Sequence, residues 1–165
     1  LTADEKLKGC VDILVQARLL PADPDTDTLA FVAAVVNLAA DRIRVFGDVL
    51  GMDEFFVTTE TLQYSDNELQ KRIVKPEQAI DLLRELRQLL ATTDTFTAEA
   101  MHKMVEAFVE QKEIRFGQIA PALRLAVTGK TKGADMFPTL ELLGKAECLS
   151  RIDRAIGKAE SMKVV

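Results

Sequence analysis

The chain has 165 residues, with 21 Lys and Arg residues against 26 Asp and Glu residues, which gives a formal net charge of -5. Its 48% hydrophobic and 28% charged residues are typical of a soluble globular protein and exclude a disordered chain. The acidity argues against binding of nucleic acid irrespective of its sequence, and the lack of Trp, with only 5% aromatic residues, leaves few side chains for base stacking.

Membrane insertion and export are not expected from the sequence. The apolar run 29–40 is shorter than the about 20 residues that a membrane span needs, so it predicts a buried helix. The charged N-terminal segment lacks the apolar core of a secretory signal, which favours a cytoplasmic location, and Leu1 in place of an initiator Met indicates a piece of a longer protein. Cys10 and Cys148 are then expected to be reduced, with a disulfide between them as the alternative. The single His102 and the lack of cysteine pairs in the sequence give no zinc site.

The first part of the chain is expected to form a small helical bundle. Apolar residues spaced by i, i+4, i+7 and i+8 predict a helix over 3–18, and Asp25 or Thr26 is expected to cap a second helix. The buried face of that second helix is predicted from its apolar spacing to hold Leu29, Val32, Val36, Ala39 and Ile43. Residues 55–57, Phe-Phe-Val, are expected to anchor the end of this bundle in the core, in an irregular or extended form.

The second part of the chain is predicted to be a series of helices. Ser65 and Glu68 form a capping box that begins a short helix, and Lys75-Pro76 marks its boundary with the next one. More helices are predicted over residues 77–91, from a cap at Thr97, and over 117–127, 136–143 and 146–159. His102 is expected at the surface or at the edge of the core.

The predicted fold class is all-α. No stretch of the sequence alternates with the period of two that marks a half-buried strand. The helices group into two consecutive small bundles, 1–66 and 67–165, joined near residues 58–68.

The sequence gives little support for catalysis by this chain. Gly129-Lys130-Thr131 is similar to the end of a phosphate-binding loop, but Arg124 stands where that motif requires a glycine. A single histidine on a helix flank offers no nucleophilic triad. Neighbouring carboxylates such as Asp23 and Asp25 lie beside turns, where helix capping explains them.

The most informative window is 114–134, which contains Arg115, Arg124, Lys130 and Lys132 but no acidic residue. A solvated helix face and loop is the simpler interpretation of this charge. Two details favour a binding site instead. Apolar neighbours of Arg124 are expected to hold its guanidinium in place, and small residues such as Gly133 permit close approach of a ligand to the backbone. A fixed arginine beside such a loop suits contacts with phosphates and with base edges.

Three segments of this region carry a family resemblance. Residues 117–129 (Gly-Gln-Ile-Ala-Pro-Ala-Leu-Arg-Leu-Ala-Val-Thr-Gly), 142–147 (Leu-Leu-Gly-Lys-x-Glu) and Arg151-Ile152 closely resemble the C-terminal region of bacterial glutamyl-tRNA synthetases. Upstream, residues 41–44 and Phe55-Phe56 are similar to the family's arginine-containing helix and aromatic anchor. The match covers essentially the whole chain.

The resemblance implies an all-helical anticodon-binding region that lacks the catalytic Rossmann domain, so this chain would not be an enzyme by itself. Its partner would be the anticodon arm of tRNA(Glu), bound by a monomer. The parent protein would be a glutamate–tRNA ligase that uses ATP and magnesium, and no cofactor is expected in this chain. A helical protein-interaction module without RNA binding, or a parent that also charges tRNA(Gln), are the alternatives.

The resemblance also implies site residues. Arg124 matches an arginine that contacts anticodon nucleotides, and the loop from Lys130 to Met136, with Lys132 and Gly133, matches the segment that reads splayed bases. Arg42, and less securely Arg44, matches an arginine that helps to distinguish the glutamate anticodon from the glutamine one. The sequence departs from the family pattern in two places. Gly133-Ala134-Asp135 replaces the family's Thr-Pro-Gly or Ser-Pro-Gly, and Leu149-Ser150-Arg151 replaces Leu-Arg-Arg.

Overall fold

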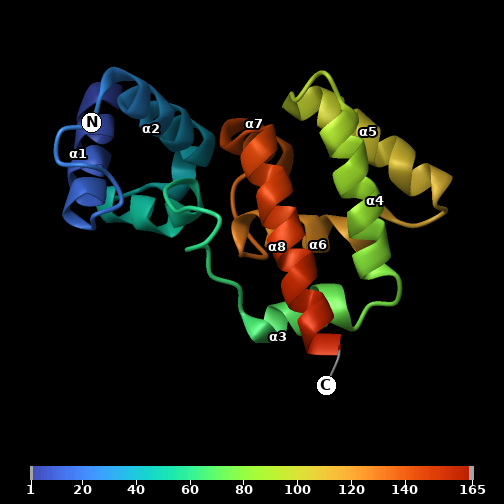
Figure 1. Ribbon diagram of the computed structural model, residues 1–165. Helices are drawn as coiled ribbons and strands as arrows, with labels where there is room; N and C mark the ends of the chain where they lie inside the picture. Colours follow the sequence, from blue (N-terminus) through green and yellow to red (C-terminus); the bar gives the residue numbers. More distant parts are fainter. Residues whose placement is uncertain (1, 164–165) are drawn as a thin grey trace. The chain divides into compact units, whose positions relative to one another are not determined.

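The computed structural model describes residues 2–163, and the chain divides into two compact units, Leu1–Thr58 and Thr59–Val165. Over the described residues the regular structure is helical and no strand is present (Figure 1). The all-α prediction is therefore confirmed. The division between the units falls after Thr58, whereas the sequence placed it after Asp66.

The first unit is built from two α-helices and two short 3-10 segments: α1 (Ala3–Gln16), α2 (Thr26–Ala39), η1 (Ala40–Arg42) and η2 (Phe46–Phe55). Asp25 caps α2 as predicted, because its carboxylate accepts a hydrogen bond of 2.7 Å from the backbone N–H of Thr28. The same hydrogen bond lowers the pKa of Asp25. The helices α1 and α2 pack against each other and against η2, which closes a small core.

Three predictions for this unit differ from the structure. Ile43 is buried as expected, but α2 ends at Ala39, so Ile43 lies beyond this helix. Leu29 is 37% exposed rather than buried, because the face of α2 that enters the core begins one turn later, at Val32. Phe55 is buried as expected but ends a 3-10 helix, while Phe56 and Val57 follow in a turn and a bend, so this part of the segment is irregular and not extended. The ring of Phe31 meets the rings of Phe55 and Phe56 edge-on, with centroids 6.4 and 5.9 Å apart.

The second unit contains α3 (Asp66–Leu69), a π-helical turn η3 (Gln70–Val74), α4 (Ala79–Thr92), α5 (Ala98–Gln111), α6 (Phe116–Thr128), α7 (Met136–Leu143) and α8 (Lys145–Lys163). The last helix, α8, packs against α4, α6, α7 and η3, so it forms the centre of this unit (Figure 1). Ser65 and Thr97 cap α3 and α5 as predicted, by accepting hydrogen bonds from Glu68 N and Ala100 N. The predicted capping box is only half formed, because the Glu68 carboxylate pairs with Arg72.

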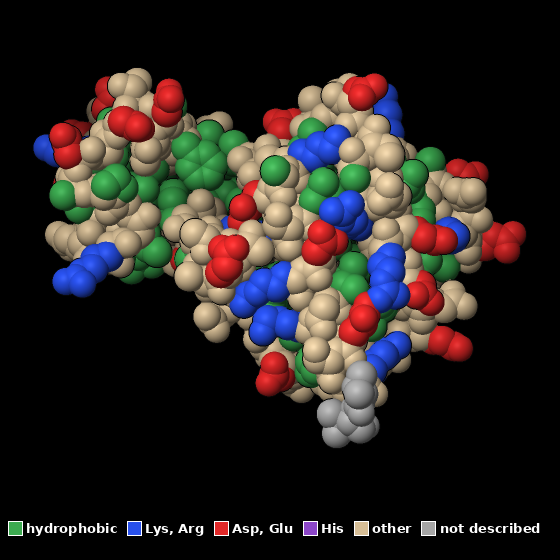
Figure 2. Space-filling model, in the orientation of Figure 1, with side chains coloured by type: hydrophobic (Ala, Val, Ile, Leu, Met, Phe, Trp, Pro, Cys, Tyr) green, Lys and Arg blue, Asp and Glu red, His purple; other side chains and the backbone are tan. Residues whose placement is uncertain are grey.

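The outer face of α4 and α8 carries acidic and basic side chains side by side (Figure 2). Arg87 of α4 pairs with Asp153 of α8 through two parallel hydrogen bonds of 2.9 and 3.0 Å. The side chain of Asp153 is 54% exposed, so this pair contributes at most about 1 kcal/mol to stability. This face is therefore an ordinary solvated surface of mixed charge.

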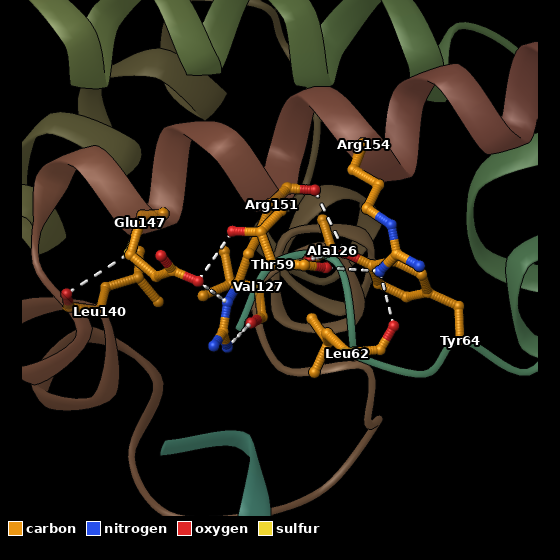
Figure 3. A network of polar contacts seen from close by, with 10 residues as sticks. Thr59, Leu62, Tyr64, Ala126, Val127, Leu140, Glu147, Arg151 and Arg154 are labelled. Carbon is orange, nitrogen blue, oxygen red and sulfur yellow. Dashed lines mark hydrogen bonds and ion pairs between the residues drawn. The ribbon is translucent and has the colours of Figure 1, made fainter. Parts of the chain in front are cut away.

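The segment that precedes α3 is connected to the second unit by hydrogen bonds, which explains why the boundary between the units falls before it (Figure 3). The Tyr64 hydroxyl donates a 2.6 Å hydrogen bond to the carbonyl oxygen of Ala126. On α8, Arg154 Nη1 donates to the carbonyl oxygens of Thr59 and Leu62. Because these partners lie on α6 and α8, the residues from Thr59 onward belong to the second unit.

Arg151 is the most deeply buried charged side chain of the same network, with 1% of its surface exposed (Figure 3). Its Nε donates to Glu147 Oε1 and its Nη1 to the carbonyl oxygen of Val127, both at 2.8 Å. The hydroxyl of Thr59 donates to the same Glu147 oxygen at 2.8 Å. The arginine that forms part of the family resemblance therefore joins α8 to the end of α6.

Tyr64 offers a direct test of this packing, because the chain has one Tyr and no Trp. Burial raises the pKa of Tyr64 from 10.0 to about 12. We expect the phenolate absorbance of the folded chain to titrate near pH 12, and that of the denatured chain near pH 10. Since the folded state favours the neutral phenol, the free energy of unfolding should fall as the pH rises through this window, and less so in Tyr64→Phe. A midpoint near pH 10 for the folded chain would contradict the buried position.

The two cysteines belong to different units, and both are buried. Cys148 lies in the core of the second unit, where its thiol donates to the carbonyl oxygen of Leu140 at 3.4 Å. Burial raises the pKa of Cys148 to about 12 and also raises that of Cys10. Neither thiol is therefore set up as a nucleophile.

Candidate nucleic-acid interface

The second unit contains a groove of about 770 Å³, bordered by η3, α5, α6, α7 and the loop between α6 and α7. This volume lies in the range of small-molecule sites. The groove is lined by charged and by aromatic side chains, among them Arg72, Glu99, Phe116, Arg124, Asp135 and Phe137.

Arg124 occupies the wall of this groove near the end of α6 and is half-buried. Its Nη1 donates a 2.8 Å hydrogen bond to the carbonyl oxygen of Ala134, so the guanidinium is held against the loop that follows the helix. The hydroxyl of Thr128 donates to the carbonyl oxygen of Arg124 at 2.8 Å and accepts from Lys130 N at 3.1 Å. Arg124 is therefore linked to the loop by a hydrogen bond to the backbone, whereas the sequence had suggested that packing by apolar neighbours would hold it.

The two glycines of this loop have different roles. Gly129 ends α6 with φ +72°, and a Cβ placed there would lie 2.4 Å from the carbonyl oxygen of Gln63. Only glycine fits this position. At Gly133 an added Cβ would lie 3.5 Å from Arg124 Nη1, which is ordinary van der Waals contact.

The structure brings part of the predicted site together. Arg124 and Met136 line the groove. Lys130, Lys132 and Gly133 belong to the loop beside it, with Lys132 exposed. Arg115 is exposed at the other end of α6, where Gln118 Oε1 accepts a 2.7 Å hydrogen bond from its backbone N–H.

Arg42 and Arg44 lie in the first unit, within the turn that follows α2. Both side chains are exposed and line a separate hollow of about 480 Å³. The carboxylate of Asp48 fixes the turn, because it accepts hydrogen bonds of 2.8 and 3.0 Å from the backbone N–H groups of Arg44 and Val45. These hydrogen bonds lower the pKa of Asp48.

Sequence reasoning missed several residues that line the groove. Arg72 reaches it from η3, where its Nε pairs with Glu68 at 3.3 Å, and no local pattern could have joined it to Arg124. Phe116 follows Arg115 inside the basic window, but the low aromatic content of the chain gives no signal for a stacking residue there. Phe137 and His102 come from two other helices.

The groove has mixed charge, which differs from the basic surface that the window suggested. Glu99 and Asp135 line it together with Arg72 and Arg124. A site of this kind would hold specific groups of a ligand instead of attracting any polyanion. Within residues 2–163 no group of three or more His, Cys, Asp or Glu side chains is arranged to hold a metal ion, and none of the helices described is both long and apolar enough to span a membrane.

Comparison with known proteins gives the family. Residues 11–156 match the model of the anticodon binding domain family, and the chain belongs to that family. It is 34% identical over 142 residues to a glutamate–tRNA ligase of Moorella thermoacetica, across 86% of this chain and 29% of that protein. A glutamate–tRNA ligase of Chloroherpeton thalassium is 30% identical over 142 residues, across 86% of this chain and 27% of that protein. The chain thus spans less than a third of the length of these relatives.

The fold matches solved structures as well. The crystal structure of a glutamate tRNA ligase from Elizabethkingia meningosepticum, in complex with its amino acid, aligns with 95% of this chain and 29% of that chain. The TM-score is 0.78 and the sequence identity is 21%. The glutamate-tRNA synthetase of Elizabethkingia anophelis aligns with a TM-score of 0.73 and 22% identity, over 95% of this chain and 29% of that chain. The helical arrangement predicted from the sequence is therefore one that known ligases contain.

Proposed function

We propose that this chain is the anticodon-binding part of a glutamate–tRNA ligase and that the groove of the second unit holds unpaired bases of the tRNA(Glu) anticodon arm. The observation that supports this most is Arg124, whose guanidinium is anchored on the Ala134 carbonyl inside a groove of about 770 Å³. Family membership over residues 11–156 supports the same function.

Recognition would follow the usual chemistry of single-stranded RNA. Unpaired bases present their polar edges to side chains, and an arginine can form two parallel hydrogen bonds with one base or one phosphate. Because Arg124 is already fixed by Ala134, little side-chain freedom would be lost on binding. Lys130 and Lys132 would contact neighbouring phosphates, which position the RNA without reading its sequence.

Arg42 and Arg44 would contribute from the first unit. Both are exposed arginines on a turn that Asp48 stabilises, so their backbone is ordered while their side chains can reach a ligand. We assign to them the discrimination between the glutamate and glutamine anticodons. Charging of tRNA(Glu) and tRNA(Gln) by the full-length ligase, with and without Arg42→Ala, tests this: loss of discrimination supports the assignment, and unchanged discrimination contradicts it.

The ligase reaction itself would belong to the remainder of the parent protein, together with its ATP and magnesium. In this proposal the present chain has no cofactor of its own and acts as a monomer in the cytoplasm. Its contribution is to fix the anticodon arm, so that the other end of the tRNA reaches the active site.

Arg124→Ala should weaken binding of an RNA hairpin that has the glutamate anticodon. The expected loss is about 1–3 kcal/mol, or roughly 5- to 150-fold in Kd, as for one paired contact to a base. Binding is measured by fluorescence anisotropy at low salt. Arg87→Ala is the matched control, because Arg87 lies on α4 and pairs with Asp153 outside the groove. Equal affinities of the two variants would remove Arg124 from the site.

The same assay tests the function as a whole. The wild-type chain should bind the hairpin with the glutamate anticodon more tightly than a hairpin whose anticodon is permuted, and its affinity should fall with rising salt. Equal binding of both hairpins and a flat salt dependence would instead indicate a helical protein-interaction module.

A further inference from the structure

Three aromatic rings that line the groove lie close to one another. His102 comes from α5, Phe116 from the first turn of α6 and Phe137 from the first turn of α7. Their ring centroids lie 4.8 Å apart for His102 and Phe137, 6.2 Å for His102 and Phe116, and 6.1 Å for Phe116 and Phe137. All three residues line the groove that Arg124 also lines, so the cluster is part of the same site.

The orientation of these rings distinguishes Phe116 from the other two. His102 stacks on Phe137 with an angle of 20° between the ring planes, so these two rings cover one face of each other. Phe116 is tilted by 57° and 55° against them, so its ring is stacked on neither of the other two. Glu106 Oε1 lies 2.9 Å from His102 Nε2 and helps to hold the imidazole in place.

Phe116 is also unusually exposed for its type. It is 36% exposed, and at positions 2–163 it is the one aromatic among the exposed large hydrophobic side chains. Leu89 on α4 is equally exposed at 37%, but it is aliphatic and lies outside the groove. A partly exposed aromatic ring therefore lines the same groove as two guanidinium groups, those of Arg72 and Arg124.

This combination matches the chemistry of an unpaired nucleotide. The flat face of a base stacks on an aromatic ring, while its edge and its phosphate accept hydrogen bonds from arginine. We propose that Phe116 is the stacking face for one unpaired base of the bound RNA, with His102 and Phe137 holding its ring in position. The proposal rests on the proposed function and adds a residue that binds a base by stacking instead of by hydrogen bonding.

The test uses the whole chain and an RNA hairpin with the glutamate anticodon. Phe116→Ala should weaken binding about 5- to 150-fold, which corresponds to the loss of one stacked base. Phe116→Leu keeps an apolar side chain but removes the ring, so it should weaken binding by at least about 5-fold, whereas Phe116→Tyr should stay within about 2-fold of the wild type. With 5-iodouridine in place of the loop uridines, near-ultraviolet light should crosslink the RNA to Phe116, since this crosslink forms with stacked aromatic rings.

Leu89→Ala is the matched control, because it removes an equally exposed side chain from another face. The proposal is overturned if Phe116→Leu binds as tightly as Leu89→Ala, or if the crosslink falls only outside the aromatic cluster. That result would leave the function intact as long as the wild type still prefers the glutamate anticodon over the permuted one. Loss of that preference in the wild type would reject the function itself.

Discussion

Replacing Arg151 by methionine should lower the free energy of unfolding of the second unit by about 3–5 kcal/mol, because it removes two hydrogen bonds of a buried guanidinium that contribute about 1.5–3 kcal/mol each. Methionine keeps the apolar stem of the side chain but leaves the Val127 carbonyl and the Glu147 carboxylate without the hydrogen bonds that Arg151 donates at 2.8 Å. Urea denaturation followed by Tyr64 fluorescence measures the effect on this unit, since the chain has one Tyr and no Trp.

Arg87→Met is the matched control for this substitution. Arg87 also forms two hydrogen bonds, both with Asp153, but that pair lies on the surface and should contribute less than about 1 kcal/mol. A loss for Arg151→Met no larger than the loss for Arg87→Met would show that the buried network does not stabilise the unit.

Gly129→Ala should cost about 2–4 kcal/mol of stability, the second largest effect that we expect. Alanine at φ +72° is strained, and its Cβ would meet the carbonyl oxygen of Gln63 at 2.4 Å. The chain would have to move either the end of α6 or the segment that contains Gln63. The same urea denaturation measures the loss, and RNA binding should weaken in parallel because the loop after Gly129 would shift.

Gly157→Ala is the control, because we expect it to change the stability in the opposite direction. Gly157 lies within α8, has open space around its Cα, and does not have a positive φ. Alanine there should stabilise the chain by about 1 kcal/mol, because it favours the helix. Destabilisation by Gly129→Ala that is no greater than about 0.5 kcal/mol would contradict the close contact with Gln63.

Much of the fold could be predicted from local sequence signals. Asp25, Ser65 and Thr97 cap helices as expected, because a capping side chain needs only the backbone N–H three residues ahead. The boundary between the units could not be predicted in this way. It depends on Tyr64 and Arg154, whose partners lie far away in the sequence.

The candidate site could also be predicted only where its residues belong to a local pattern. Arg124 stood out because the basic window and the family resemblance both include it, and the structure places it in the groove. Arg72 and Phe137 reach the groove from distant helices, and neither is marked by any local pattern. Arg151 belongs to the resembling segment, yet it is buried and holds α8 to the end of α6.

The composition of the chain was a poor guide to the chemistry of the groove. A formal net charge of -5 argued against an RNA partner. Charges act over about 10 Å at ordinary salt, so the side chains around the groove, and not the net charge of the chain, determine the electrostatic potential that a ligand meets there. The low aromatic content argued against stacking, yet three helices bring His102, Phe116 and Phe137 together in one place.

An NMR titration tests the central claim most directly. The nitrogen-labelled chain is titrated with the hairpin that has the glutamate anticodon, and the backbone amide signals are followed residue by residue. We predict that the shifts concentrate at residues 116–136, at the turn of α5 around His102 and at the turn that contains Arg42 and Arg44, while the α4–α8 surface around Arg87 and Asp153 stays unchanged. Shifts confined to that α4–α8 surface, or identical shift patterns with the permuted hairpin, would contradict recognition of the anticodon in the groove.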